Sequence, residues 1–316
     1  MEAQARMRNA KVLVINLGSL AAETVKNLVL AGIGAITIVD ENNVGAEDLG
    51  ANFFLTDEDV GKNRASAAQR RIEKLNPRVA VSCEEKSVKG IDSKWLANYD
   101  LVLATELDYD QFCTINEASR EAKRPFYAAG LCGLFGFVFA DLIEHTFTID
   151  RVNPNTGQKL GPETSTREIL SVDTKEEGGT VTQVVKKIER YRSLKEVVQG
   201  LDESFGTGLS TRQKLRVNPL LPLLLAQWDG PYEYEDQLRT KAAEKCKQLG
   251  LPAEIVTDSA VSFFYNGIGA EFSPVAAILG GVLAQNILNY FSQSIQPIQN
   301  ALLFNGLTNE GPIYVL

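Results

Sequence analysis

The stretch that decides the fold is VLVINLGSLAAETVKNLV, residues 12–29. Its apolar start predicts a buried strand, Gly18 predicts a turn, and the spacing of the later Leu and Val residues predicts an amphipathic helix. A strand, a glycine turn and a helix outline a nucleotide-binding unit, in which the helix N-terminus approaches a phosphate. Three glycines are usual in such a turn, whereas this chain has Asn16, Gly18 and Ala21. These residues alone leave two interpretations open: a phosphate site, or the start of a doubly wound sheet without a ligand.

Alternating strand and helix signals continue through the first 150 residues, a pattern typical of a parallel sheet covered by helices. Strands are predicted over residues 11–16, 35–40, 79–83, 100–105 and 125–129, and helices over residues 19–31, 62–75 and 109–123. The glycine-containing run at 130–142 predicts further strands, antiparallel to the first set. Asp40 ends the second strand, where a dinucleotide site has its ribose-binding acid, but such an acid is also a common turn cap. The expected fold class is α/β, a Rossmann-like, doubly wound mixed sheet.

The middle of the chain has a different character. Residues 153–179 are polar and rich in turn formers, which predicts a mobile loop. Helices are predicted over residues 181–199, 218–228 and 233–249. The last sixty residues are apolar again: Ser273 and Pro274 start a long predicted helix, and two short strands follow it. Gly280 and Gly281 lie within that helix, where glycine is unfavourable, so we expect another backbone to approach closely there.

These signals divide the chain into three parts. Residues 1–154 form the N-terminal part of the sheet domain. Residues 155–255 form a polar loop and a helical insertion. Residues 256–316 form a helix and a β-pair that complete the sheet domain.

Composition restricts the function further. The chain has 40 acidic and 32 basic residues, a formal net charge of −8, which argues against nucleic acid as the main partner. No apolar run is long enough to predict a membrane-spanning helix. The single histidine, His145, and four widely spaced cysteines argue against a Cys/His zinc site and most histidine-assisted nucleophiles. The cysteines, interpreted as buried reduced thiols, are Cys83, Cys113, Cys132 and Cys246.

Several segments together resemble the adenylating domain of the enzymes that activate ubiquitin-like proteins, and of their bacterial relatives MoeB and ThiF. They are NLVLAGIGAITIVDENNV (27–44), ANFFL (51–55), DVGKNRA (59–65), INEASREAKRPF (115–126), GLCGLFGFVFADL (130–142) and SPVAAILGGVLAQNILNYF (273–291). Within this family the length, the DRV stretch at 150–152 and the C-terminal helix are most similar to the smaller subunit of SUMO-activating enzymes. The resemblance implies the adenylating-domain fold with an insertion in the middle of the chain.

The resemblance also implies that the nucleotide site of this chain is degenerate. Asn16, Gly18 and Ala21 stand at the triple glycine, and Asp40 and Asn42 at an Asp-x-Asp pair. Gly50 and Ala51 replace an asparagine and a phosphate-binding arginine, Arg64 stands at a lysine position, and Leu107 replaces an Mg²⁺-binding aspartate. Without these groups the triphosphate lacks the cations that would neutralise it, and Mg²⁺ lacks its carboxylate ligand. No catalytic residue, bound cofactor or metal is therefore expected in this chain.

For partners, the resemblance implies a heterodimer. A larger catalytic subunit is expected to bind ATP and Mg²⁺ and to carry the thioester-forming cysteine, with SUMO as the protein substrate. The expected location is the nucleus, with the cytoplasm as a second location left open. The candidate dimer interface consists of Asn52, Phe53, Pro274, Gly280 and Gly281. Two alternatives stay open: the non-catalytic subunit of the neddylation-activating enzyme, which is normally longer, and a stand-alone Rossmann nucleotide-dependent enzyme.

Overall fold

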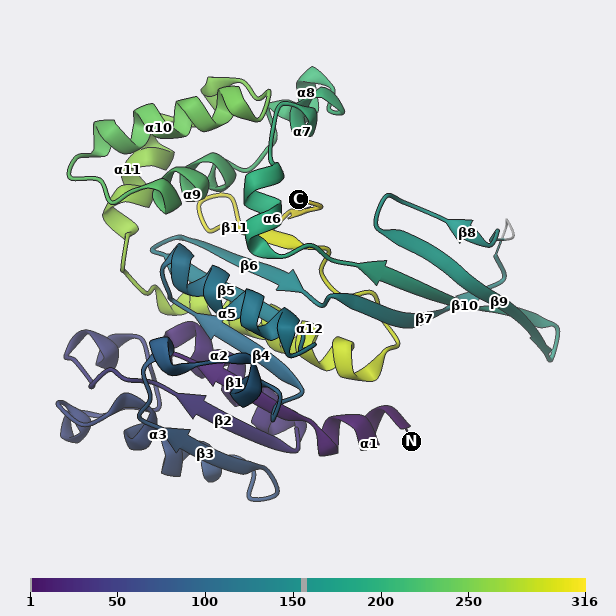
Figure 1. The fold of residues 1–316 in the computed structure, drawn as a ribbon, viewed down its shortest axis with the longest axis horizontal. Coiled ribbons are helices and arrows are strands. Elements are labelled where there is room, and N and C mark those ends of the chain that lie inside the picture. The colour runs from purple at the N-terminus through teal and green to yellow at the C-terminus, as the bar shows by residue number, and fades with distance from the viewer. Residues whose placement is uncertain (1, 155–157) are drawn as a thin grey trace.

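The computed structural model describes residues 2–154 and 158–316. Its centre is an eight-stranded sheet in the order β12-β11-β6-β5-β4-β1-β2-β3 (Figure 1). The strands are β1 (Lys11–Ile15), β2 (Ala35–Val39), β3 (Ala80–Glu84), β4 (Leu101–Thr105), β5 (Phe126–Cys132), β6 (Phe135–Asp141), β11 (Ala301–Asn305) and β12 (Ile313–Tyr314). β1 to β5 pair in parallel, whereas β6, β11 and β12 pair antiparallel to their neighbours. The predicted doubly wound mixed sheet is confirmed.

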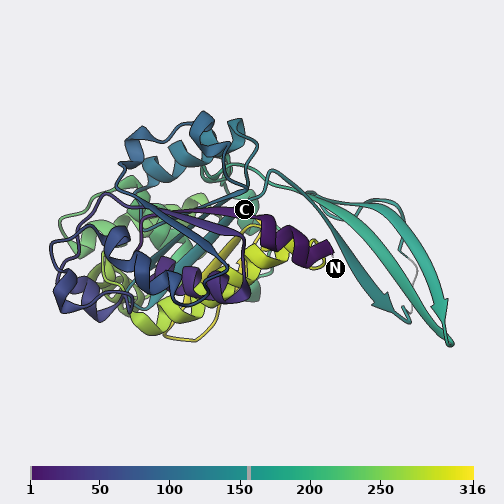
Figure 2. The ribbon, with the colours of Figure 1, turned by 90° about the horizontal axis from the view of Figure 1, so that it is seen from below.

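Helices cover both faces of this sheet (Figure 2). One apolar core lies under α1 (Glu2–Asn9), α2 (Ser19–Ala31), α3 (Arg64–Glu73) and α12 (Ser273–Ser292). The other core lies under α4 (Ser93–Leu96), α5 (Tyr109–Glu121), α6 (Leu194–Gly200), α9 (Leu220–Asp229), α10 (Glu235–Gln248) and α11 (Asp258–Gly267). The remaining helical turns are η1 (Glu47–Gly50), η2 (Asp57–Asp59), η3 (Val88–Gly90), α7 (Ser204–Thr207), α8 (Thr211–Lys214) and η4 (Ala253–Ile255). α9 and α10 correspond to the helices predicted over 218–228 and 233–249.

A second sheet projects from the body of the protein, and we call it the β arm (Figures 1 and 2). It consists of β7 (Glu144–Val152), β8 (Gly161–Pro162), β9 (Arg167–Glu177) and β10 (Thr180–Arg190), in the order β7-β10-β9-β8. The mobile loop predicted over 153–179 is therefore wrong where β8 and β9 lie. The predicted boundary between residues 154 and 155 and the order of 155–157 lie outside the described residues.

The helix predicted over residues 181–199 is also wrong for its first half, since β10 covers those residues and α6 begins only at Leu194. β10 is rich in β-branched residues, which suit a pleated surface. It pairs antiparallel with β7 on one side and with β9 on the other, with Val185 opposite both Ile149 and Val172. Because of these pairings between distant segments, residues 180–190 form a strand, although their local charge pattern is that of a helix.

Helix α12 returns the chain to the sheet and packs along α2. A Cβ atom added to Gly280 would lie 2.5 Å from Cβ of Glu23 and 3.1 Å from the backbone nitrogen of Thr24. The expected close approach is confirmed for Gly280, whereas a Cβ at Gly281 would meet nothing within 4 Å, so the expectation is wrong there. By length and composition alone α12 could span a bilayer, contrary to the expectation from sequence. In this fold eight of its residues are buried inside the protein.

Candidate functional site

The residues expected to form a degenerate nucleotide site centre on the carboxyl ends of β1 and β2, beside the point where the strand order turns from β1 to β4. Open α/β sheets bind ligands in the crevice at such a switch point. Asn16 directly follows β1 and has a left-handed backbone with φ 69°. Its side-chain amide donates hydrogen bonds to the carbonyl oxygens of Thr105 (2.9 Å), the last residue of β4, and of Glu106 (3.1 Å), which follows it. Asn16 therefore ties β1 to β4 across the crevice.

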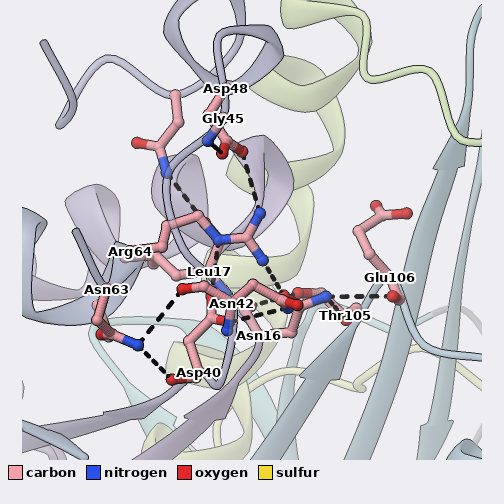
Figure 3. Close-up of polar contacts among 12 residues, drawn as sticks. Asn16, Leu17, Asp40, Asn42, Gly45, Asp48, Asn63, Arg64, Thr105 and Glu106 are labelled. Atoms are coloured by element: carbon pink, nitrogen blue, oxygen red, sulfur yellow. Dashed lines mark hydrogen bonds and ion pairs between the residues drawn. The ribbon is translucent and has the colours of Figure 1, made fainter. Parts of the chain in front are cut away.

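Arg64, from the first turn of α3, reaches the carboxyl ends of β1 and β2. Its Nε donates to Oδ2 of Asp40 at 2.7 Å and its Nη1 to Oδ1 of Asp48 at 3.0 Å, while Nη2 donates to Oδ1 of Asn16 (Figure 3). We call these four residues the Arg64 cluster. The side chain of Arg64 is only 11% exposed. Burial by itself would lower the pKa of Arg64, but the hydrogen bonds and charges of Asp40 and Asp48 raise it above its usual value.

The remaining acceptors of the Arg64 cluster are also used within the chain. Oδ2 of Asp40 accepts from the backbone N–H of Leu17 (2.9 Å), and its Oδ1 accepts from the backbone (2.9 Å) and side-chain (3.1 Å) nitrogens of Asn42. Oδ2 of Asp48 accepts from the N–H of Gly45 at 2.8 Å. The acid that would bind a ribose thus orders the loops around it instead.

A carboxylate from a distant segment occupies the N-terminus of α2. Oε2 of Glu271, in the loop before α12, accepts from the backbone N–H of Ser19 at 2.6 Å. Its Oε1 lies so near Gly18 that a Cβ there would be 2.3 Å from it. Helix N-termini attract anions because their first N–H groups lack partners and the helix dipole is positive at that end. Glu271 therefore lies where a phosphate would bind in a working site.

The other predicted site residues do not join the Arg64 cluster. Ala21 is buried inside α2. Gly50 and Ala51 lie at the end of η1, where Gly50 accepts a hydrogen bond through its carbonyl from Oγ of Ser273 at 3.0 Å. Leu107 is half-buried between β4 and α5 and lines a separate cavity.

Residues that sequence reasoning missed complete the site: Asp48, Asn63, Glu106 and Glu271. Asn63 had a local signal, since it caps α3 by accepting from the N–H of Ser66, and its amide also donates to the carbonyl of Asp40 at 2.8 Å. Glu106 lies next to Leu107, the position assigned to the lost aspartate. Glu271 had no local signal, because 252 residues separate it from Ser19.

The candidate interface residues divide into two groups. Asn52 is fully buried and donates to the carbonyl of Leu17 at 3.0 Å, and Gly280 is covered by α2, so both serve packing within the chain. Phe53 is 47% exposed, Pro274 is exposed and Gly281 is half-buried with free space above it. Only this second group is accessible to a partner.

The cysteines and the histidine have environments that suppress reactivity. All four thiols are free, and burial raises the pKa of each one, to about 12 for Cys83 and Cys132 and about 11 for Cys246. A thiol with such a pKa is a poor nucleophile at neutral pH. His145 is buried in β7 against Tyr290, and burial lowers its pKa to about 4. These side chains contribute to packing.

Sequence comparison agrees with this architecture. The model of the ThiF family matches residues 1–314, and the chain belongs to this family. Among similar proteins, DNA damage tolerance protein RHC31 of Saccharomyces cerevisiae is 36% identical, with 99% of this chain and 92% of that protein covered. Rad31 of Schizosaccharomyces pombe, also described as a DNA damage tolerance protein, is 32% identical with the same coverages.

A third relative and a solved structure extend this comparison. SUMO-activating enzyme subunit 1 of Homo sapiens is 27% identical, with 100% of this chain and 91% of that protein covered. The crystal structure of E. coli MccB with succinimide superposes with a TM-score of 0.54 at 14% identity, covering 99% of this chain and 65% of that one. The likeness to MccB shows a shared fold, and this chain spans just under two thirds of that chain.

Proposed function

We propose that this chain is the non-catalytic small subunit of a heterodimeric SUMO-activating enzyme. In this proposal the larger subunit binds ATP and Mg²⁺, adenylates the C-terminus of SUMO and then holds it as a thioester on its own cysteine. This chain completes and stabilises the assembly in the nucleus. The relatives described as SUMO-activating enzyme subunit 1, which align over the whole chain, support the assignment.

The observation that carries the non-catalytic role is the Arg64 cluster together with Glu271. Each of the three guanidinium nitrogens of Arg64 already donates to an acceptor inside the chain. A triphosphate at the N-terminus of α2 would have to displace Glu271 and would lie near the carboxylates of Asp40 and Asp48. Like charges repel strongly in a poorly hydrated site, so these groups oppose nucleotide binding.

The accessible interface candidates support a position for the larger subunit. The hydrogen bond from Ser273 to the carbonyl of Gly50 places the start of α12 beside the segment that carries Phe53. Ile278 of α12 and Phe272 before it are 46% and 44% exposed. Exposed apolar residues gathered in this way are typical of protein interfaces. In the proposal this surface packs against the larger subunit.

Reconstitution with the catalytic subunit of a SUMO-activating enzyme tests this function. We expect the two chains to co-purify at one-to-one stoichiometry and to support SUMO-dependent exchange between ATP and pyrophosphate. The isolated chain should show no exchange and no thioester on its cysteines. Strong exchange by the isolated chain, or failure to associate, would contradict the proposal. Preferential assembly with the catalytic subunit for neddylation, or tight NAD binding by the chain alone, would favour the alternatives.

A further inference from the structure

A cavity of about 480 Å³ lies at the carboxyl ends of β4 and β5. The start of α5 and helices α9 and α11 complete its walls. We call it the aromatic cavity, with Glu106, Tyr109, Gly130, Phe137 and Trp228 as its defining residues. Its volume falls within the range of about 300–1,000 Å³ that is usual for small-molecule sites.

Aromatic rings form one wall of the aromatic cavity. The rings of Tyr109 and Trp228 stack with their centroids 5.1 Å apart and an angle of 25° between their planes. The ring of Phe137 meets Trp228 edge to face, with centroids 5.7 Å apart. Rings in these arrangements attract one another beyond the effect of the area that they bury, so a flat aromatic ligand can extend the wall.

The carboxyl group of Glu106 belongs to this cavity and points away from the Arg64 cluster (Figure 3). Its Oε1 accepts from the backbone N–H of Leu131 at 2.8 Å, and no described residue hydrogen-bonds to its Oε2. A Cβ built on Gly130 would lie 3.6 Å from this Oε2 and 2.7 Å from the ring of Phe137. The free oxygen of Glu106 therefore lies over Gly130, next to the aromatic wall.

The charges around the aromatic cavity favour an uncharged ligand. Burial raises the pKa of Glu106 well above its usual value, and the carboxylate of Glu271 raises it further. The carboxyl is therefore protonated at neutral pH, with Oε1 accepting from Leu131 and Oε2 free to donate. The other charged residues among the described lining are the exposed Asp108 and Asp110, and none is Lys, Arg or His. An anion would be repelled by these two carboxylates, and a cation would lack an ionised partner at Glu106.

We infer that the aromatic cavity binds a flat, uncharged heteroaromatic molecule that has a hydrogen-bond acceptor. The ring lies against Tyr109 and Trp228, and a ring nitrogen accepts a hydrogen bond from the carboxyl of Glu106. A donor that is covered without receiving an acceptor costs free energy, so the heterocycle is preferred over a hydrocarbon of the same shape. The cavity is separate from the Arg64 cluster, so this binding is independent of the proposed function.

Quinoline and naphthalene provide a matched test, because they share one shape and only quinoline has a ring nitrogen. The indole N–H signal of Trp228 is followed by NMR as the full chain is titrated, and Trp95→Phe identifies this signal, since the chain has two tryptophans. We expect saturable binding of quinoline and at least about tenfold weaker binding of naphthalene. N-methylquinolinium, a cation of similar shape, should also bind at least about tenfold more weakly. Equal or tighter binding of naphthalene or of the cation, or no binding of quinoline at millimolar concentrations, would overturn the inference.

Three variants test whether Glu106 is the donor. Glu106→Gln keeps a donor in its side-chain amide, so the preference for quinoline over naphthalene should persist. Glu106→Leu has no donor, so quinoline should bind at least about tenfold more weakly and the preference should disappear. Glu117→Leu is the control and should leave binding unchanged, because Glu117 lies on α5 outside the cavity and pairs with Lys195. Thermal melting establishes that each variant is folded. A preference that survives in Glu106→Leu, or is lost in Glu106→Gln, would overturn the role of Glu106.

The pH dependence of quinoline binding provides a readout that a purely structural role of Glu106 would not give. The titratable and charged groups around Glu106 are Glu271 before α12, Arg64 of α3, Cys132 of β5, and Asp108, Tyr109 and Asp110 at the start of α5. Only the protonated carboxyl donates, so over the range in which quinoline is uncharged its affinity should fall as pH rises through the raised pKa of Glu106. Glu106→Gln should bind quinoline equally well at each pH. The same pH profile in both proteins would overturn the role of the Glu106 proton.

Discussion

The Arg64 cluster and the aromatic cavity, which has a volume of about 480 Å³ and is lined among others by Glu106, Tyr109 and Trp228, lie at the same edge of the sheet and differ in how far they are filled. In the first, Arg64, Asp40 and Asp48 are bonded to one another and to neighbouring backbone. In the second, open space remains between the ends of β4 and β5 and helices α9 and α11. The chain's own side chains thus fill the first region, whereas the second stays open.

The Arg64 cluster and Glu271, together called the closed region, hold protein groups at the switch point of the sheet, where open α/β sheets bind their ligands. Glu271 supplies an anion to the N-terminus of α2, and Arg64 bonds to carboxylates instead of to a phosphate. Such substitutions preserve the fold because buried charges stay paired. The comparison predicts that breaking the closed region lowers the free energy of unfolding.

The largest effect is expected for Arg64→Leu. This change leaves the buried carboxylates of Asp40 and Asp48 without their cation, and loss of one partner in a buried pair costs about 3–5 kcal/mol in the free energy of unfolding. Chemical denaturation measures the loss. The control is Arg239→Leu. Arg239 pairs with Glu235, Asp236 and Asp258 at the surface, and loss of these exposed ion pairs should cost less than about 1 kcal/mol. Similar losses in both variants would contradict the structural role of the Arg64 cluster.

Gly280→Ala should have the next largest effect, because its Cβ would overlap Glu23 on α2. We expect a loss of about 1–3 kcal/mol in the free energy of unfolding, as is typical of overpacking. Gly281→Ala is the matched control: its Cβ has free space, and alanine favours a helix by up to about 1 kcal/mol. Equal behaviour of the two variants would refute the close packing of α12 on α2.

Glu271→Ala should reduce stability by about 1 kcal/mol at neutral pH, since it removes an acceptor and a negative charge from the start of α2. Thermal unfolding of Glu271→Ala and of the control Glu41→Ala measures this effect, since Glu41 is an exposed acidic residue of the same region. No difference between the two would show that Glu271 does not stabilise the helix. The variant should also lower the pKa of Glu106, because a neighbouring negative charge is lost.

The smallest effect is a pH dependence of stability due to Glu106. Its pKa is raised in the folded protein, so the folded state holds a proton that the unfolded chain releases above a pKa of about 4.3. This contribution is fully present below that pH and is lost as pH rises through the folded pKa. The stability of the wild type relative to Glu106→Gln should therefore fall with rising pH. A constant difference from pH 4 to pH 8 would argue against the raised pKa.

The local patterns predicted much of the sheet domain. The strand–turn–helix around Gly18 and the alternation up to β5 follow from short-range periodicity, and the structure confirms them. The β arm could not be predicted this way, because β10 becomes a strand through pairing with β7 and β9, which are distant contacts. Pairing with neighbouring strands can override the local preference of a segment for helix or strand.

The candidate site was predictable only in part. Asn16, Asp40 and Arg64 were singled out from their positions, and the structure brings them together. Their bonding to one another could not be derived, because it depends on Asp48 in the loop after β2 and on the approach of α3 to β1. Glu271 reaches α2 through the return of the chain at α12, a contact set by the whole fold.

Calorimetric titration of the isolated chain with ATP and Mg²⁺ tests the central claim most directly. The claim is that Arg64 and Glu271 have replaced the nucleotide at this site. We predict no binding, or a dissociation constant weaker than about 1 mM, while the reconstituted heterodimer binds ATP through its larger subunit. A dissociation constant in the micromolar range for the chain alone, abolished by Arg64→Leu in a folded variant, would contradict the claim.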